Sequence, residues 1–367
     1  MGPGAFDSPG QPHHTARDSG FRCLGMRGRM TAPVSDATAG TTHLNELDGF
    51  RALSILAVMA CHMLPLGPEQ WELNSTSGYM GMSVFFALSG FLITRFLWER
   101  PDIKVFALRR LARIAPLVLL VSVVYGLLVE QRPDSFLAIN LYVLNYWTSA
   151  INPSVSPLWS LAVEMHFYIG IALAVLVFGR RGFLLVPVVA ALVTGMRVEG
   201  EVFGAIQTHR RVDEILAGSM LALVFLNRTQ PLVARLWHAL PVLFWPLFLL
   251  WCLSCWPPSE ALGYLRPYLT AGMMGSVIAM TGGWQSALLG NRVLRYIALI
   301  SFALYVWHSP FRHYWFASGD KWEIYLIRRP LGILATFVLA HLSTFHFETP
   351  ITRWVRDRTR LQRPAVS

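Results

Sequence analysis

Long runs of apolar residues constrain the fold of this chain more than any other feature. An α-helix of about twenty apolar residues crosses the hydrocarbon core of a bilayer. Charged residues make up only 14% of the 367 residues and hydrophobic residues 54%, whereas soluble domains carry about 25% charged residues. This composition argues against a single soluble enzyme, a disordered chain and a nucleic-acid-binding module. We therefore expect an all-α protein, a polytopic membrane bundle of about ten transmembrane helices.

The apolar runs give the positions of these helices. A further run at residues 136–147 is too short to cross and is expected to form a re-entrant or interfacial segment. The ten predicted spans are residues 50–66, 79–98, 114–130, 158–179, 183–198, 212–227, 237–256, 267–284, 296–316 and 330–349.

The basic residues predict the orientation of the bundle. The net charge of +10 could suggest a nucleic-acid partner, but the arginines cluster at the ends of apolar runs, which is typical of helices oriented in a bilayer. Cytoplasmic loops are enriched in Lys and Arg. If the densest basic loop is cytoplasmic, alternation of the ten spans places both termini in the cytoplasm. That loop follows the second span and contains Arg95, Arg100, Lys104, Arg109, Arg110 and Arg113.

The distribution of apolar residues predicts three regions along the chain. Residues 1–43 have no apolar periodicity and lack the apolar core of a signal peptide, so we expect a disordered cytoplasmic segment. Residues 44–350 form the membrane domain, and residues 351–367 form a basic cytoplasmic tail. Cys252 and Cys255 have CxxC spacing without a second ligand pair, so they are expected to pack rather than to bind a metal, and no metal site is predicted.

Arg51 and His62 form the most informative pair of ionisable residues within the apolar runs. They are eleven residues apart, which brings them within about 20° of the same helix face and roughly 16 Å apart along the axis. Ionisable groups within a span are costly and mark functional sites by default. A lone histidine is usually a packing residue, but one aligned with Arg51 and Asp48 favours a function.

Arg110 and Arg113 share a helix face at the predicted cytoplasmic rim. Arginine forks match phosphate groups well, so the pair could hold an anionic cytosolic ligand. A basic anchor that fixes the helix orientation explains the same spacing equally well.

Five further polar or aromatic residues complete the candidate set. Glu164 and Tyr168 share one face of the fourth span, and a carboxylate there should be either neutralised or paired with His or Arg. Trp159 opens that span, and Asp213 enters the sixth. His308, in the ninth span, fits a substrate pathway and simple packing equally well.

These segments, in this order, resemble the bacterial membrane acyltransferase-3 family of O-acyltransferases, from about Leu44 to Pro350. The family includes acetylases of O-antigens and exopolysaccharides and acyltransferases of macrolides. The matching motifs are Arg51-x10-His62, Gly78-Tyr79-x-Gly81 with 85–92, Arg110-x-x-Arg113, Trp159-Ser160-Leu161 with Glu164 and Phe167-Tyr168, Arg211 to Gly218, Leu304-Tyr305 to His308-Ser309-Pro310, and Glu348-x-Pro350.

The chain departs from the family pattern in two places. Relatives often have Glu-Glu-Gln-Phe-Tyr where this chain has Glu164-Met165-His166-Phe167-Tyr168, which keeps only the first carboxylate. Some relatives carry a soluble C-terminal transferase domain, which we do not expect here because the sequence ends soon after the last predicted span.

The resemblance implies a multi-pass protein of the bacterial inner (plasma) membrane that transfers an acyl group, commonly acetyl, from acyl-CoA to a hydroxyl. The acceptor would be a cell-surface polysaccharide, a glycolipid or a macrolide-type metabolite. Acyl-CoA is then a co-substrate, no cofactor is permanently bound, and the remaining partner is the lipid bilayer.

Roles follow for the candidate residues on this resemblance. Arg110 and Arg113 would bind the donor, Arg51 would orient it or stabilise negative charge, and His62 would act as general base or carry the acyl group transiently. Glu164 would fix a His62 tautomer or bind the acceptor. The expected substrate-binding residues are Tyr168, Trp159, Asp213 and His308.

Two other classes of protein fit the same residues. Buried Arg, Glu and His also line the pathways of transporters of small molecules or acyl-carrier lipids, although the two halves of the chain show none of the internal repeats that many transporters have. A structural or sensory membrane protein would show neither transfer nor transport.

Overall fold

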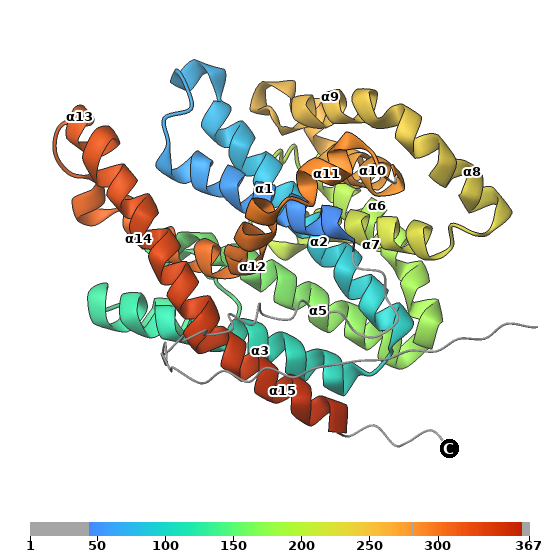
Figure 1. The fold of residues 1–367 in the computed structure, drawn as a ribbon, viewed down its shortest axis with the longest axis horizontal. Helices are drawn as coiled ribbons and strands as arrows, with labels where there is room; N and C mark the ends of the chain where they lie inside the picture. The colour runs from blue at the N-terminus through green and yellow to red at the C-terminus, as the bar shows by residue number, and fades with distance from the viewer. Residues whose placement is uncertain (1–43, 281, 362–367) are drawn as a thin grey trace, which may run out of the picture.

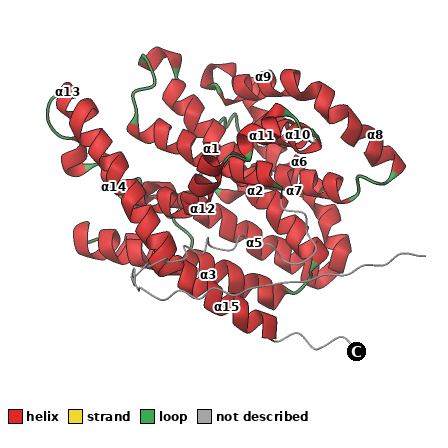
Figure 2. Ribbon diagram, viewed as in Figure 1, coloured by secondary structure: helices red, strands yellow, loops and turns green. Residues whose placement is uncertain are grey.

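The computed structural model describes residues 44–280 and 282–361, and this part of the chain consists of helices and connecting loops without a strand (Figure 2). The prediction of an all-α fold is confirmed. The expected disordered segment 1–43 lies outside the described residues. The α-helices are α1 (Asn45–Met63), α2 (Leu73–Glu99), α3 (Ile103–Val121), α4 (Pro133–Asn140), α5 (Trp159–Phe178), α6 (Leu185–Glu199), α7 (Asp213–Leu226), α8 (Pro231–Ala239), α9 (Phe244–Cys255), α10 (Arg266–Ala279), α11 (Trp284–Leu289), α12 (Arg292–Trp307), α13 (Lys321–Glu323), α14 (Arg329–Leu342) and α15 (Thr349–Leu361).

Each of the ten predicted spans falls on one or more of these helices. Several helices continue into neighbouring helical segments: α3 runs into a π-helical stretch, and α14 is joined to α15 by another. Within the described ranges, five continuous helical segments are long and apolar enough to cross a membrane, namely residues 73–99, 103–129, 156–199, 231–255 and 321–359. The run at 136–147 forms only the short helix α4 and loop, in line with its predicted failure to cross.

Helix α2 lies in the middle of the bundle, between α1 and α7 (Figure 1). Small residues permit this close packing. A Cβ atom added to Gly90 of α2 would lie 1.8 Å from the carbonyl oxygen of Ile215 in α7, and one added to Gly81 would lie 2.6 Å from that of Ser54 in α1. A larger side chain at either glycine would therefore push α2 away from its neighbour.

The outside of the bundle is strongly apolar. Leu176 and Val177 of α5 are each 67% exposed, Leu232 of α8 is 79% exposed, and Val242 is 83% exposed. In water such a surface would be unfavourable, whereas lipid tails solvate it without cost. Together with the five long apolar segments, this surface identifies a multi-pass membrane protein.

Candidate functional site

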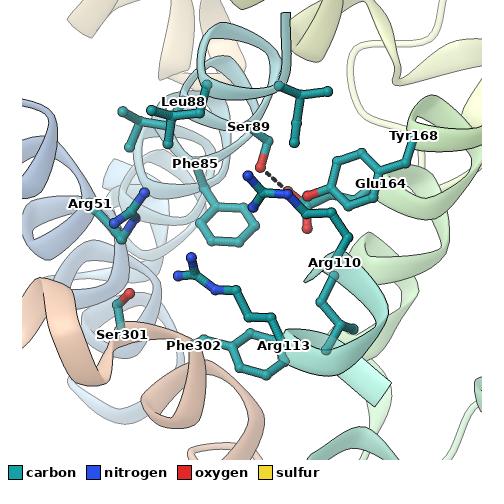
Figure 3. Close-up of a pocket in the computed structure, with 13 residues that line it drawn as sticks. Arg51, Phe85, Leu88, Ser89, Arg110, Arg113, Glu164, Tyr168, Ser301 and Phe302 are labelled. Carbon is teal, nitrogen blue, oxygen red and sulfur yellow. Dashed lines mark hydrogen bonds between the residues drawn. The ribbon is translucent and has the colours of Figure 1, made fainter. Parts of the chain in front are cut away.

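Three arginines from two helices converge on one cavity. Arg51 comes from α1, and Arg110 and Arg113 come from α3 (Figure 3). Helix α3 starts where Asp102 Oδ1 accepts a hydrogen bond of 3.0 Å from the backbone N–H of Val105. This N-cap defines where the helix begins. Arg110 and Arg113, three residues apart, lie on one face of it and both line the cavity.

The other walls of the arginine cavity come from α2, α5 and α12. Glu164 and Tyr168 of α5 lie side by side there, as their spacing predicts, and the hydroxyl of Ser89 in α2 donates a hydrogen bond to Glu164 (Figure 3). Three guanidinium groups and one carboxylate line the cavity, so it attracts anions. Its volume is about 50 Å³, which accommodates small groups only.

His62 lies at the other end of α1 and pairs with a second histidine. Its Nδ1 atom is 2.9 Å from Nε2 of His308 in the loop after α12, and the planes of the two rings are nearly parallel, with an interplanar angle of 8°. His308 is fully buried, and its Nδ1 atom lies 2.7 Å from the backbone carbonyl oxygen of Tyr305.

These contacts assign the tautomers of both rings. A carbonyl oxygen only accepts, so Nδ1 of His308 must be the protonated nitrogen, and in a neutral imidazole Nε2 is then an acceptor. His62 therefore donates its Nδ1–H to His308. The lone pair of His62 is left on Nε2, at the ring edge away from His308, where it can accept a proton.

His62 borders a second, larger cavity of about 670 Å³. This volume lies within the range of small-molecule binding sites. Trp159 at the start of α5, Arg211 before α7 and Tyr305 of α12 line it too. The cavity is therefore large enough for a substrate, with a base and a cation in its wall.

Two stacked aromatic rings link the walls of the two cavities. Phe85 of α2 lines the arginine cavity and Tyr305 lines the larger one, and their ring centroids are 5.8 Å apart with an interplanar angle of 15°. The Tyr305 hydroxyl is held by Ser160 at 2.6 Å and donates to the carbonyl oxygen of Pro157. Arg51 and His62 thus face two adjoining compartments rather than one continuous channel.

The structure brings most of the predicted site residues to these two cavities. Arg51, Arg110, Arg113, Glu164 and Tyr168 line the arginine cavity, and His62 and Trp159 line the larger one.

Three placements differ from the expected arrangement. Glu164 lies with the arginines, so the partner that fixes the His62 tautomer is His308. His308 lies behind His62 and is not among the lining residues of either cavity. Asp213 is fully buried, also away from both linings, in an ion pair of 2.6 Å with Arg197 of α6.

Sequence reasoning gave no role to four residues that shape the site. Arg211 and Tyr305 belong to motifs quoted above without a function, Phe85 and Ser89 lie in the segment 85–92 quoted with them, and the geometry places all four around the two cavities. Only the burial of Arg211 could have been suspected beforehand, since an arginine next to an apolar span needs partners.

The described residues contain no group of three or more His, Cys, Asp or Glu side chains arranged to hold a metal ion. Cys252 and Cys255 are not bonded to each other, and Cys255 is buried.

Comparison with known sequences points to one family. The profile described as "Acyltransferase domain" of the acyltransferase-3 family matches residues 44–345, which include both cavities. No solved structure matches the chain.

Several curated proteins are similar to most of this chain. The peptidoglycan O-acetyltransferase OatA of Listeria monocytogenes is 29% identical over 356 residues, which covers 85% of this chain and 56% of the relative. A putative O-acetyltransferase of Staphylococcus aureus is 27% identical (85% and 58% covered), and the putative peptidoglycan O-acetyltransferase YrhL of Bacillus subtilis is 28% identical (84% and 55% covered). The chain thus spans little more than half the length of these relatives.

Proposed function

Because this chain belongs to the acyltransferase-3 family, we propose that it is a membrane O-acyltransferase that transfers an acyl group, in the first place acetyl, from acyl-CoA to a hydroxyl of a carbohydrate. The observation that carries the proposal is the pair of adjoining cavities. One cavity is lined by three arginines and the other by a histidine whose Nε2 lone pair can accept a proton, and Phe85 in the wall of the first stacks on Tyr305 in the wall of the second.

The arginine cavity is the proposed donor site. Coenzyme A carries several phosphate charges, and guanidinium groups bind phosphate through paired, charge-assisted hydrogen bonds. Arg110 and Arg113 would hold the donor, and Arg51 would orient its thioester end. Since the cavity is small, the bulk of the coenzyme would stay outside it, unless side chains move on binding.

His62 is the proposed general base. The thioester end would pass between Phe85 and Tyr305 into the larger cavity when the acceptor is bound. As the acceptor hydroxyl oxygen attacks the thioester carbonyl carbon there, Nε2 of His62 takes the hydroxyl proton, the C–S bond breaks, and the proton passes to the departing thiolate of CoA. The products are the O-acyl ester and free CoA. The tautomer set by His308 supports this role, because it leaves the lone pair on Nε2.

The membrane arrangement extends the same proposal. With ten spans and both termini in the cytoplasm, the basic start of α3 lies on the cytoplasmic side of the bacterial inner membrane, where acyl-CoA is made. His62, eleven residues along α1 from Arg51, then lies roughly 16 Å deeper. The larger cavity would receive its acceptor from the opposite side.

The identity of the acceptor is proposed from the relatives. Two of them are described as peptidoglycan O-acetyltransferases or putative ones, so a saccharide of the cell surface is the first choice. A macrolide is the alternative acceptor implied by the wider family.

Acceptor-dependent release of CoA tests the proposal. The full chain, purified and reconstituted in lipid nanodiscs, would be incubated with acetyl-CoA and saccharide or macrolide acceptors, and both CoA and acetylated product measured. The wild type is expected to release CoA in step with product, whereas His62→Ala should fall to background. His341→Gln is the matched control, because His341 forms a hydrogen bond with Tyr296 and lines neither cavity.

Two results would contradict the proposal. One is turnover retained in His62→Ala that is properly inserted, which would remove the base from the mechanism. The other is counterflow of an unmodified solute in liposomes without CoA release, which would identify a transporter instead.

A further inference from the structure

The larger cavity has a buried cation in its wall that the proposed acyl transfer does not use. The side chain of Arg211 is only 3% exposed, and its Nη2 atom lies 3.3 Å from Oε2 of Glu214. This ion pair lacks hydrogen-bond geometry, since neither that oxygen nor Nε of Arg211 has a hydrogen-bond partner. Arg211 is therefore held loosely for a buried arginine.

Glu214, the carboxylate partner of Arg211, also pairs with a second arginine at a shorter distance. Glu214 Oε1 accepts a hydrogen bond of 2.8 Å from Nε of Arg266, which is fully buried. The neighbouring Asp213 is occupied by Arg197 at 2.6 Å. Three guanidinium groups thus face two carboxylates, and among the described residues no further carboxylate forms an ion pair with them. One positive charge remains uncompensated.

Aromatic rings surround Arg211 but supply only part of the missing compensation. Its guanidinium carbon lies 5.7 Å from the ring centroid of Tyr79 and 5.8 Å from those of Phe86 and Trp159. Cation–π contacts of this length stabilise the charge less than the loss of a counter-ion destabilises it in a buried position. Buried charges of this kind are concentrated at functional sites, where a bound ligand can supply the missing counter-charge.

We infer that Arg211 binds an anionic group of the acceptor, so that the larger cavity takes a saccharide that carries a carboxylate. The charge of this ligand follows from the cavity itself, and its being a saccharide rests on the proposed function. A carboxylate would form charge-assisted hydrogen bonds with the guanidinium, while His62, in the same cavity wall, meets the acceptor hydroxyl. Trp159 and Tyr79 would enclose the apolar part of the ligand.

A binding experiment without donor tests this inference separately from acyl transfer. The full chain in nanodiscs would be titrated with N-acetylmuramic acid and with its methyl ester, which differ in one negative charge. A hydrogen bond to a charged group is worth about 1.5–3 kcal/mol, so the acid should bind roughly 10- to 100-fold more tightly than the ester.

Two variants of the cavity wall keep the test informative. Arg211→Gln should abolish the preference for the acid. However, this variant also removes a side chain from the buried ion pairs of Arg211, Glu214 and Arg266, and so it can fail to fold. Gln207→Glu adds a negative charge at a half-buried position of the cavity lining, outside these ion pairs. It should weaken binding of the acid and leave binding of the ester unchanged, and Arg113→Gln in the donor cavity should affect neither.

The possible outcomes separate the two proposals. Equal binding of acid and ester by the wild type, no binding of either, or a preference that survives Gln207→Glu would overturn the anion site. A preference that behaves as expected, in a protein that never transfers acetyl groups, would confirm the anion site and refute the proposed function.

Discussion

Nδ1 of His62 and Nε2 of His308 lie 2.9 Å apart, and the second histidine is itself anchored by the carbonyl oxygen of Tyr305. The two rings therefore form a chain of hydrogen bonds with a defined direction, from His62 through His308 to the backbone of α12. Helix α12 ends at Trp307, so this chain connects the ends of two helices that pack against each other.

Substitution of His308 tests whether this residue positions the proposed base. His308→Leu removes the acceptor for the Nδ1–H of His62, so both tautomers of His62 become accessible and kcat should fall roughly 10- to 100-fold, the usual cost of losing a partner that orients a functional imidazole. KM for both substrates should stay unchanged, because His308 is not part of either cavity lining. Steady-state kinetics in nanodiscs measure both constants.

The matched variant for this test is His308→Gln. Its amide oxygen can still accept the hydrogen bond, so much of the lost kcat should return. Equal rates in the Leu and Gln variants, or a rise in KM with kcat preserved, would instead favour a direct substrate-binding role for His308.

Arg113→Gln tests the donor site. Loss of one charge-assisted hydrogen bond to phosphate costs about 1.5–3 kcal/mol, so KM for acetyl-CoA should rise roughly 10- to 100-fold while KM for the acceptor is unchanged. Arg109→Gln is the control, since Arg109 lies on the same helix but its Nε contacts Thr359 at 3.2 Å. A similar rise in both variants would mean that α3 is only a basic anchor.

The sequence predicts the arginine cavity well because its geometry is largely helical. Arg110 and Arg113 are three residues apart and Glu164 and Tyr168 four apart, so each pair shares a helix face irrespective of the rest of the fold. The eleven-residue spacing of Arg51 and His62 likewise fixes their common side of α1. The spacing does not show whether this face of α1 borders one cavity or two.

The contacts that periodicity could not supply are those between distant segments. His62 and His308 are 246 residues apart, and Arg266 reaches Glu214 across 52 residues. Both contacts depend on how α1, α7, α10 and α12 pack. For the same reason Asp213, expected to touch substrate, lies instead beside Arg197. The number of membrane crossings depends equally on tertiary context, because α7 and α10 are only 14 residues long and are largely buried.

Asp213→Asn distinguishes a structural ion pair from a substrate contact. The substitution leaves Arg197, which is 1% exposed, without its counter-charge, and breaking a buried ion pair on one side costs about 3–5 kcal/mol. We expect a large drop in the midpoint of thermal unfolding and in the yield of folded protein. Glu199→Gln, at the exposed end of α6, should change neither. A stable Asp213→Asn protein with a raised acceptor KM would show that Asp213 binds substrate.

Phe85→Ala tests whether the aromatic stack separates the donor and acceptor compartments. Without the Phe85 ring, the arginine cavity and the larger cavity would join next to Tyr305, and water from the acceptor side could reach the thioester, which an enclosed site excludes. Hydrolysis of acetyl-CoA without acceptor should then increase several-fold, while acceptor-dependent transfer decreases. CoA release and acetylated product, measured in parallel with and without acceptor, give both rates. Phe85→Leu keeps most of the apolar volume, so its hydrolysis rate should stay close to that of the wild type. If Phe85→Ala remains folded and its hydrolysis is unchanged, the stack does not act as a barrier, and the two cavities must already communicate during turnover by another route.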